Sequence, residues 1–137
     1  MLRQLPEKYP GKVRVVFKNF PLSRHKYAKK AALAALAARK QGKHIEFHDT
    51  LFKNYKRLND TKIMDIAKEL NLDIEQLQKD MEDPAIKRLM FSDIMDGRKA
   101  GVQSVPSMFI NGKYLKIRSN QELYQMIEEE LKNIDQP

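Results

Sequence analysis

Residues Ala100–Leu115 read AGVQSVPSMFINGKYL, and this stretch decides the fold. Its centre is the dipeptide Asn111–Gly112, which lies between two short apolar runs. A two-residue hairpin turn needs positive φ angles, which Asn and Gly adopt most readily. The stretch therefore predicts two paired strands, Ser107–Ile110 and Lys113–Ile117, joined at that dipeptide.

A second strand signal lies near the start of the chain. Lys12–Phe20 is rich in valine and phenylalanine, as expected for a buried strand, and Pro21 ends it. Ahead of it, Leu2–Tyr9 carries apolar residues at helical spacing until Pro10–Gly11 stops the pattern. We interpret Leu2–Tyr9 as the last turns of a helix.

The long middle of the chain is expected to be helical, and one more helix should follow the hairpin. Cap residues, an early proline and apolar spacing of three and four residues mark these segments. In the segment 44–55, the residues Ile45, His48, Leu51, Phe52 and Tyr55 should share one face. The predicted helices are Ser23–Gln41, His44–Tyr55, Asn59–Leu70, Asp73–Met81, Pro84–Ala100 and Gln121–Asn133.

The order of elements, with a helical block between the first strand and a terminal hairpin and helix, resembles the DsbA-like branch of the thioredoxin superfamily. Three stretches carry the resemblance, which runs from about Leu2 to Leu131: YPGKVRVVFKNFPL at Tyr9–Leu22, GKHIEFHDTLFKN at Gly42–Asn54, and Ala100–Leu115.

The resemblance implies an α/β, thioredoxin-like fold with an inserted helical subdomain. Residues 1–137 would form one domain, with the thioredoxin part in 1–22 and 101–137 and the helical part in 23–100. Such proteins begin with a strand that leads into Cys-x-x-Cys at the start of the first helix. We therefore expect an N-terminally truncated chain, in which the first strand and the start of the first helix are missing.

By family, the expected function is thiol–disulfide oxidoreductase or protein disulfide isomerase. The sequence contains no cysteine, and thiol exchange requires a thiolate. The chain should therefore be redox-inactive as given, with no catalytic residue and no cofactor of its own. Whether it counts as an enzyme stays open.

The resemblance also implies a substrate-binding loop at Val105–Pro106, where the family carries a cis peptide bond facing the reactive cysteine. An ordinary trans turn is the alternative reading, but the flanking sequence favours cis. Because proline has no N–H, an extended polypeptide can pair with the backbone of the preceding residue as an added strand. Extended polypeptide substrates are the expected partners.

The net charge of +8 raises other classes of partner, among them nucleic acid, an anionic membrane surface and an acidic protein. The densest basic stretch, Arg24–Lys30, has no row of interleaved aromatic residues on which successive bases could stack, so a solvated helix face fits it better than a nucleic-acid site. A non-catalytic peptide-binding or chaperone-like module is the main alternative to an oxidoreductase, and nucleic-acid binding ranks third.

The remaining expectations concern metals, membranes and assembly. His44 and His48 lie one helical turn apart. The His-Glu-x-x-His pattern is not met, because Glu46 comes two residues after His44 and not directly after it, so we expect no metal site. No apolar run is long enough for a signal peptide in Met1–Pro10 or for a membrane span anywhere. The compartment stays unknown, although DsbA-like proteins usually work outside the cytosol. Exposed strand edges would allow a homodimer.

Overall fold

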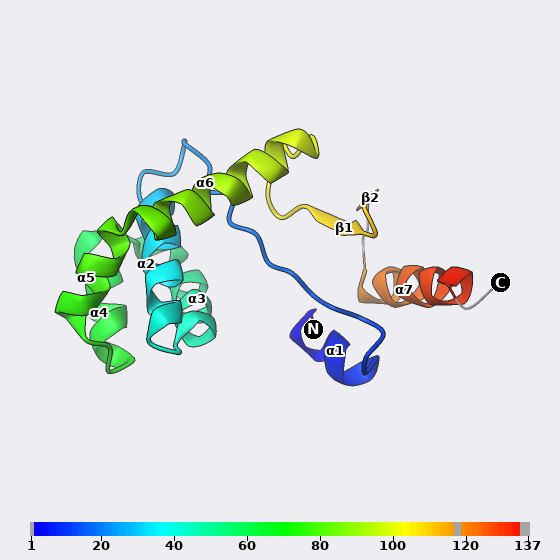
Figure 1. Ribbon diagram of the computed structural model, residues 1–137, viewed down its shortest axis with the longest axis horizontal. Coiled ribbons are helices and arrows are strands. Elements are labelled where there is room, and N and C mark those ends of the chain that lie inside the picture. The colour runs from blue at the N-terminus through cyan, green and yellow to red at the C-terminus, as the bar shows by residue number, and fades with distance from the viewer. Residues whose placement is uncertain (1, 117–118, 135–137) are drawn as a thin grey trace. The chain divides into compact units, whose positions relative to one another are not determined.

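The computed structural model describes residues 2–116 and 119–134. The described chain is mainly helical, with a single two-stranded sheet. Contacts divide it into two compact units, one formed by Met1–Phe17 with Ser104–Pro137 and the other by Lys18–Gln103 (Figure 1). The two units have separate hydrophobic cores.

The larger unit is a bundle of helices, and the starts of α4, α5 and α6 follow from their cap residues. Asn59 accepts a hydrogen bond from the backbone N–H of Lys62 at the start of α4, and Asp73 caps α5 in the same way. Pro84 occupies the first turn of α6, as the sequence predicted. The elements are α2 (Ala28–Lys40), α3 (His44–Lys53), η2 (Tyr55–Arg57), α4 (Asp60–Glu69), α5 (Ile74–Glu82) and α6 (Pro84–Lys99).

The alanine-rich helix α2 lies at the centre of this bundle and contacts α3, α4, α5 and α6. Ala34, Ala37 and Ala38 are fully buried. Because their side chains are small, the neighbouring helices can approach closely and bring larger residues against α2. Fully buried large residues on those helices are Phe47, Ile63, Ile66 and Leu77.

The C-terminal end of α2 holds both ends of α5. The Gln41 amide donates to the carbonyl of Asp73 at 3.0 Å and accepts from its N–H at 2.9 Å. Lys40 Nζ lies 2.9 Å from Asp80 and 2.6 Å from Asp83. Asp80 is only 5% exposed, so this ion pair compensates a carboxylate that would otherwise be buried alone.

The smaller unit contains η1 (Leu2–Gln4), α1 (Leu5–Lys8), β1 (Met108–Ile110), β2 (Lys113–Leu115) and α7 (Asn120–Ile134). Its core is formed by the buried residues Leu5, Leu115, Leu123 and Ile127. Apolar residues of three separate stretches thus meet around α7.

The hairpin prediction is confirmed. β1 and β2 are antiparallel with Phe109 opposite Tyr114, and the rings of this pair meet edge to face at 5.3 Å. Asn111 and Gly112 have φ angles of 47° and 80°, the left-handed values that the turn requires. Ile117, the predicted end of the second strand, lies outside the described residues.

The strand predicted over Lys12–Phe20 is wrong for the described structure. The segment has no regular secondary structure, because the two hairpin strands pair with each other and no described strand lies beside this one (Figure 1). It still alternates: Val13 and Val15 pack on the small core, whereas Val16 is exposed. The side-chain pattern of a strand is therefore present without its hydrogen bonds.

The predicted inward face of α3 is also partly wrong. Phe47 and Leu51 are the buried residues of this helix, whereas Ile45, Phe52 and Tyr55 are each more than half exposed. The sequence holds two neighbouring apolar stripes, and only one can face the bundle. The stripe that contains Phe47 does so, which leaves the other in solvent.

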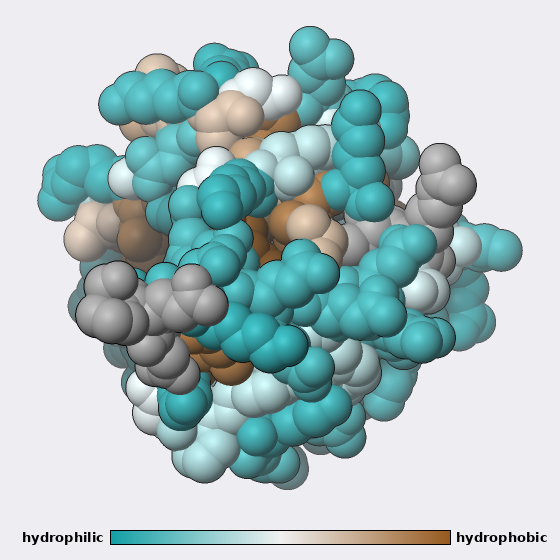
Figure 2. Space-filling model, turned by 90° about the vertical axis from the view of Figure 1, so that its right-hand side faces the viewer, coloured by the Kyte–Doolittle hydropathy of each residue, from teal (hydrophilic) through white to brown (hydrophobic). Residues whose placement is uncertain are grey.

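On the face shown in Figure 2, hydrophilic side chains cover most of the surface, and apolar areas lie between them. Among residues 2–116 and 119–134, no helix is both long and apolar enough to cross a membrane.

The stability of the bundle should depend on the buried stripe of α3. We expect Phe47→Ala to lower the free energy of unfolding by about 3–5 kcal/mol, because it removes a fully buried ring from the core. Phe52→Ala on the same helix is the matched control and should change it by less than about 0.5 kcal/mol. Urea unfolding followed by circular dichroism measures both, and equal losses would contradict the assignment of the two stripes.

The Lys40 network should make stability depend on pH. Hydrogen bonds from Lys40 lower the pKa of Asp80 and of Asp83 below the ordinary value of 3.8. A carboxyl group with a lowered pKa stabilises the fold above its unfolded pKa and loses that contribution as the pH falls through the folded pKa.

Lys40→Met should therefore be less stable than the parent near neutral pH, and the difference should narrow below about pH 4. Unfolding free energies measured over this range test the expectation. Lys43→Met, which removes an exposed partner of Glu46, should keep the parental pH dependence. Parallel curves for the parent and Lys40→Met would refute the role of the network.

Candidate functional site

The Val105–Pro106 loop immediately precedes β1 in the smaller unit. Its peptide bond is cis. The Ser107 hydroxyl donates to the carbonyl of Ser104 at 2.7 Å and closes the loop across the proline. The Val105 side chain is 47% exposed, so an apolar group is presented to solvent at this point.

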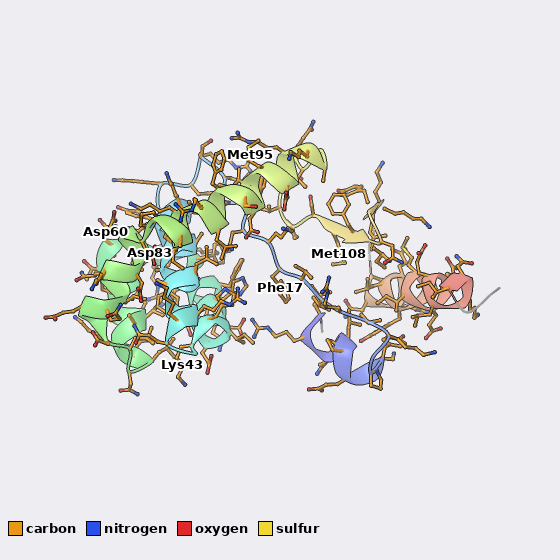
Figure 3. All side chains as sticks on the ribbon, viewed as in Figure 1. Phe17, Lys43, Asp60, Asp83, Met95 and Met108 are labelled. Atoms are coloured by element: carbon orange, nitrogen blue, oxygen red, sulfur yellow. The ribbon has the colours of Figure 1, made fainter. Side chains whose placement is uncertain are left out.

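The backbone beside this loop is open for pairing. Val105 makes no backbone hydrogen bond to another described residue, and β1 has a described partner, β2, along only one edge. Met108, labelled in Figure 3, begins that strand. A loop that ends in an open strand edge can accept an extended chain as an additional strand.

The site has no reactive group for covalent sulfur chemistry. The sequence contains no cysteine, so no thiolate is available at the loop or elsewhere in the chain. His44 and His48 have ring centroids 6.2 Å apart. In the part of the chain that the structure describes, no three His, Cys, Asp or Glu side chains are arranged to hold a metal ion.

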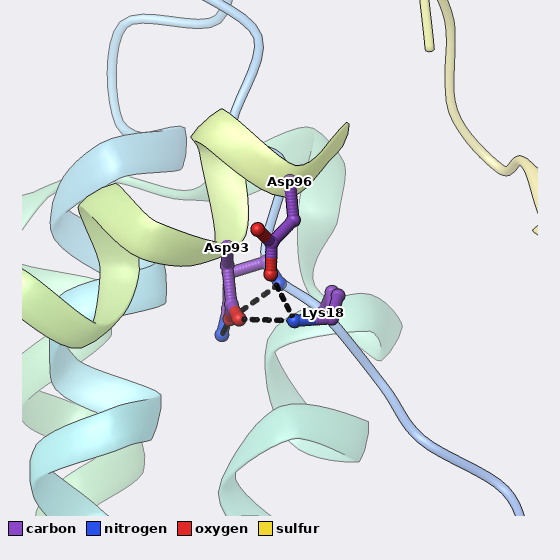
Figure 4. Close-up of polar contacts among 4 residues, drawn as sticks. Lys18, Asp93 and Asp96 are labelled. Atoms are coloured by element: carbon purple, nitrogen blue, oxygen red, sulfur yellow. Dashed lines mark hydrogen bonds and ion pairs between the residues drawn. The ribbon is translucent and has the colours of Figure 1, made fainter. Parts of the chain in front are cut away.

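Lys18 is the first residue of the larger unit. The structure places it against two carboxylates of α6, with Nζ 2.7 Å from Asp96 and 3.5 Å from Asp93 (Figure 4). The hydrogen bond raises the pKa of Lys18 and lowers that of Asp96. Half of the Lys18 side chain remains exposed, and its ammonium group is engaged in an ion pair within the larger unit.

Asp93 was missed by the sequence reasoning. Its carboxylate accepts hydrogen bonds from the backbone N–H and the side-chain amide of Asn19, at 2.9 and 3.0 Å. Asp93 is buried, with 8% of its surface exposed. The sequence feature that could have identified it is an acidic residue within an otherwise apolar stripe of α6. Together with Lys18, these contacts fasten residues 18 and 19 to α6.

Phe20 continues this attachment at Gly97. A Cβ atom at position 97 would lie 2.6 Å from the Phe20 ring, too close for any side chain without a shift. The ring therefore packs directly on the backbone of α6.

The comparisons with known proteins agree with this architecture. A solved thioredoxin-like oxidoreductase from Silicibacter pomeroyi superposes with a TM-score of 0.77 and 30% sequence identity over 96% of this chain and 75% of that one. The fold is therefore that of the thioredoxin-like oxidoreductases. Residues 1–129 match the family model described as Thioredoxin. The chain belongs to this family, in its DsbA-like branch.

Relatives of two kinds were found. A Bacillus cereus protein named probable disulfide bond formation protein D is 32% identical over 123 residues, which cover 82% of this chain and 56% of that protein. The Na⁺/H⁺ antiporter NhaA 3 of Salinispora tropica is 31% identical over 102 residues, which cover 74% of this chain and 16% of the antiporter. The chain thus spans about half of the first relative and a small part of the second.

Proposed function

We propose that this chain supplies the polypeptide-binding part of a DsbA-like thiol–disulfide oxidoreductase or isomerase. It holds an extended substrate segment along Ser104–Ile110 and does not exchange disulfides itself. The observation that carries the proposal is the exposed Val105–Pro106 loop next to the open edge of β1.

Strand addition suits an unfolded or extended substrate. Backbone hydrogen bonds give affinity without regard to sequence, and side-chain contacts at alternate positions add selectivity. Val105 offers one such apolar contact at the entrance to the strand. A protein that acts on many polypeptides needs this kind of weakly selective binding.

The exchanging sulfur must come from outside these 137 residues, because thiol exchange needs a thiolate and the sequence has none. The family membership and the names of the Bacillus cereus and Silicibacter pomeroyi proteins support a role in disulfide chemistry. Taken by itself, the chain is then a non-catalytic polypeptide-binding module.

The open strand edges also allow pairing between two copies of the chain. A net charge of +8 on each copy opposes that association, most strongly at low salt. A bound polypeptide is therefore the occupant that we favour for the edge of β1.

Polypeptide binding should be sensitive to a charge at the loop. We expect the chain to bind a fluorescent, reduced and carboxymethylated polypeptide, and Val105→Asp to weaken that binding about tenfold, because the new carboxylate would be desolvated under the peptide. Fluorescence anisotropy measures the affinity. Insulin reduction by dithiothreitol, followed in parallel, should not be accelerated by the chain.

Ile134→Asp is the matched control, since it places the same charge at an exposed aliphatic position of α7. It should bind the polypeptide as the parent does. Equal binding by the parent and Val105→Asp would show that the loop is not the binding site, and absence of binding by the parent would refute the proposed function.

A further inference from the structure

A cluster of aromatic and basic side chains lies where α3 ends and η2 follows. Phe52 and Tyr55 are 65% and 64% exposed. Lys53, Lys56 and Arg57 are exposed between and beside them. We call these five residues the α3–η2 cluster. All of them belong to the larger unit, whereas the Val105–Pro106 loop belongs to the smaller one.

Most other lysines of the bundle pair with a carboxylate, and the cations of this cluster do not pair with one in the part of the chain that the structure describes. Lys30, Lys40 and Lys62 each lie within 4.0 Å of a carboxylate. Within the described residues, no carboxylate lies that close to Lys53, Lys56 or Arg57, and the Lys56 ammonium lies 5.7 Å from the centre of the Tyr55 ring. The acidic residues of α3 stand earlier in the helix, at Glu46, which pairs with Lys43 at the N-cap, and at Asp49.

This combination matches the chemistry of a lipid headgroup layer. Tyrosine and other aromatic rings favour the boundary between headgroups and acyl chains, and exposed Lys and Arg attract anionic phospholipids. We propose that the α3–η2 cluster docks the chain onto an anionic phospholipid surface, with Phe52 and Tyr55 inserted at the interface and the three cations among the headgroups.

Other partners fit the cluster less well. Single-stranded nucleic acid is held by a basic groove that follows its backbone past several aromatic rings, whereas this cluster covers six consecutive residues at a helix end. A stable protein interface needs roughly 800 Å² per partner around buried anchors. Two rings that are each about two-thirds exposed suit a soft surface into which they can insert.

A tryptophan reporter tests the insertion, because the sequence contains no tryptophan. In the full chain, the emission of Phe52→Trp should shift to shorter wavelength with vesicles of phosphatidylcholine and phosphatidylglycerol, and brominated acyl chains should quench it. Phosphatidylcholine vesicles alone should have little effect. Phe91→Trp, at an exposed ring of α6, is the matched control and should show neither change.

Charge variants separate a local site from the effect of net charge. Reversing Lys53, Lys56 and Arg57 to Glu should weaken binding to the anionic vesicles about tenfold or more. Reversing Arg24, Lys26 and Lys29 to Glu lowers the net charge by the same amount in the other basic stretch and should weaken it less than about threefold. Circular dichroism checks that both variants are folded.

Three results would overturn the proposal. Equal losses in the two charge variants would assign binding to net charge alone, and equal spectral shifts at positions 52 and 91 would place the contact elsewhere. Binding of single-stranded nucleic acid through the same cluster, together with no binding to anionic vesicles at low salt, would show that the partner is different.

Discussion

The close approach of four helices to α2 is the constraint on which the larger unit depends. Ala34, Ala37 and Ala38 remove the bulk that would keep those helices apart, so Phe47 and Leu77 can be fully buried around them. The same helix then ends in the two polar residues that fix α5. Packing and polar contacts on α2 thus set the positions of α3 and α5 together, and with them the stripe of α3 that remains exposed.

Local sequence signals predicted most of the elements, because each was specified by a short-range interaction. The hairpin followed from Asn111–Gly112, and the starts of α4 and α5 followed from Asn59 and Asp73, whose side chains bond to backbone groups three residues ahead. The two predictions that were wrong depended on contacts with residues distant in the sequence. Whether Lys12–Phe20 becomes a strand depends on a pairing partner, and the buried face of α3 depends on which stripe meets α2.

The candidate site was predicted from a family resemblance, and little of it follows from local physics. The residues Val105–Pro106 do not by themselves specify a polypeptide site. The structure adds the exposed Val105 side chain and an edge of β1 that no other described strand pairs with, both of which depend on the arrangement of the smaller unit. The zero cysteine count has a firmer consequence, because it separates substrate holding from sulfur chemistry regardless of the fold.

The contact between Phe20 and Gly97 limits how this sequence can vary. Gly101 and Gly112 have open space where a side chain would begin. Only their positive φ angles disfavour substitution, and asparagine tolerates that backbone conformation. At position 97 even a methyl group would collide with the Phe20 ring, which follows directly on the two residues fastened to α6. In a library of random variants, position 97 should accept a larger residue only when position 20 becomes smaller, so the two sites would change as a pair.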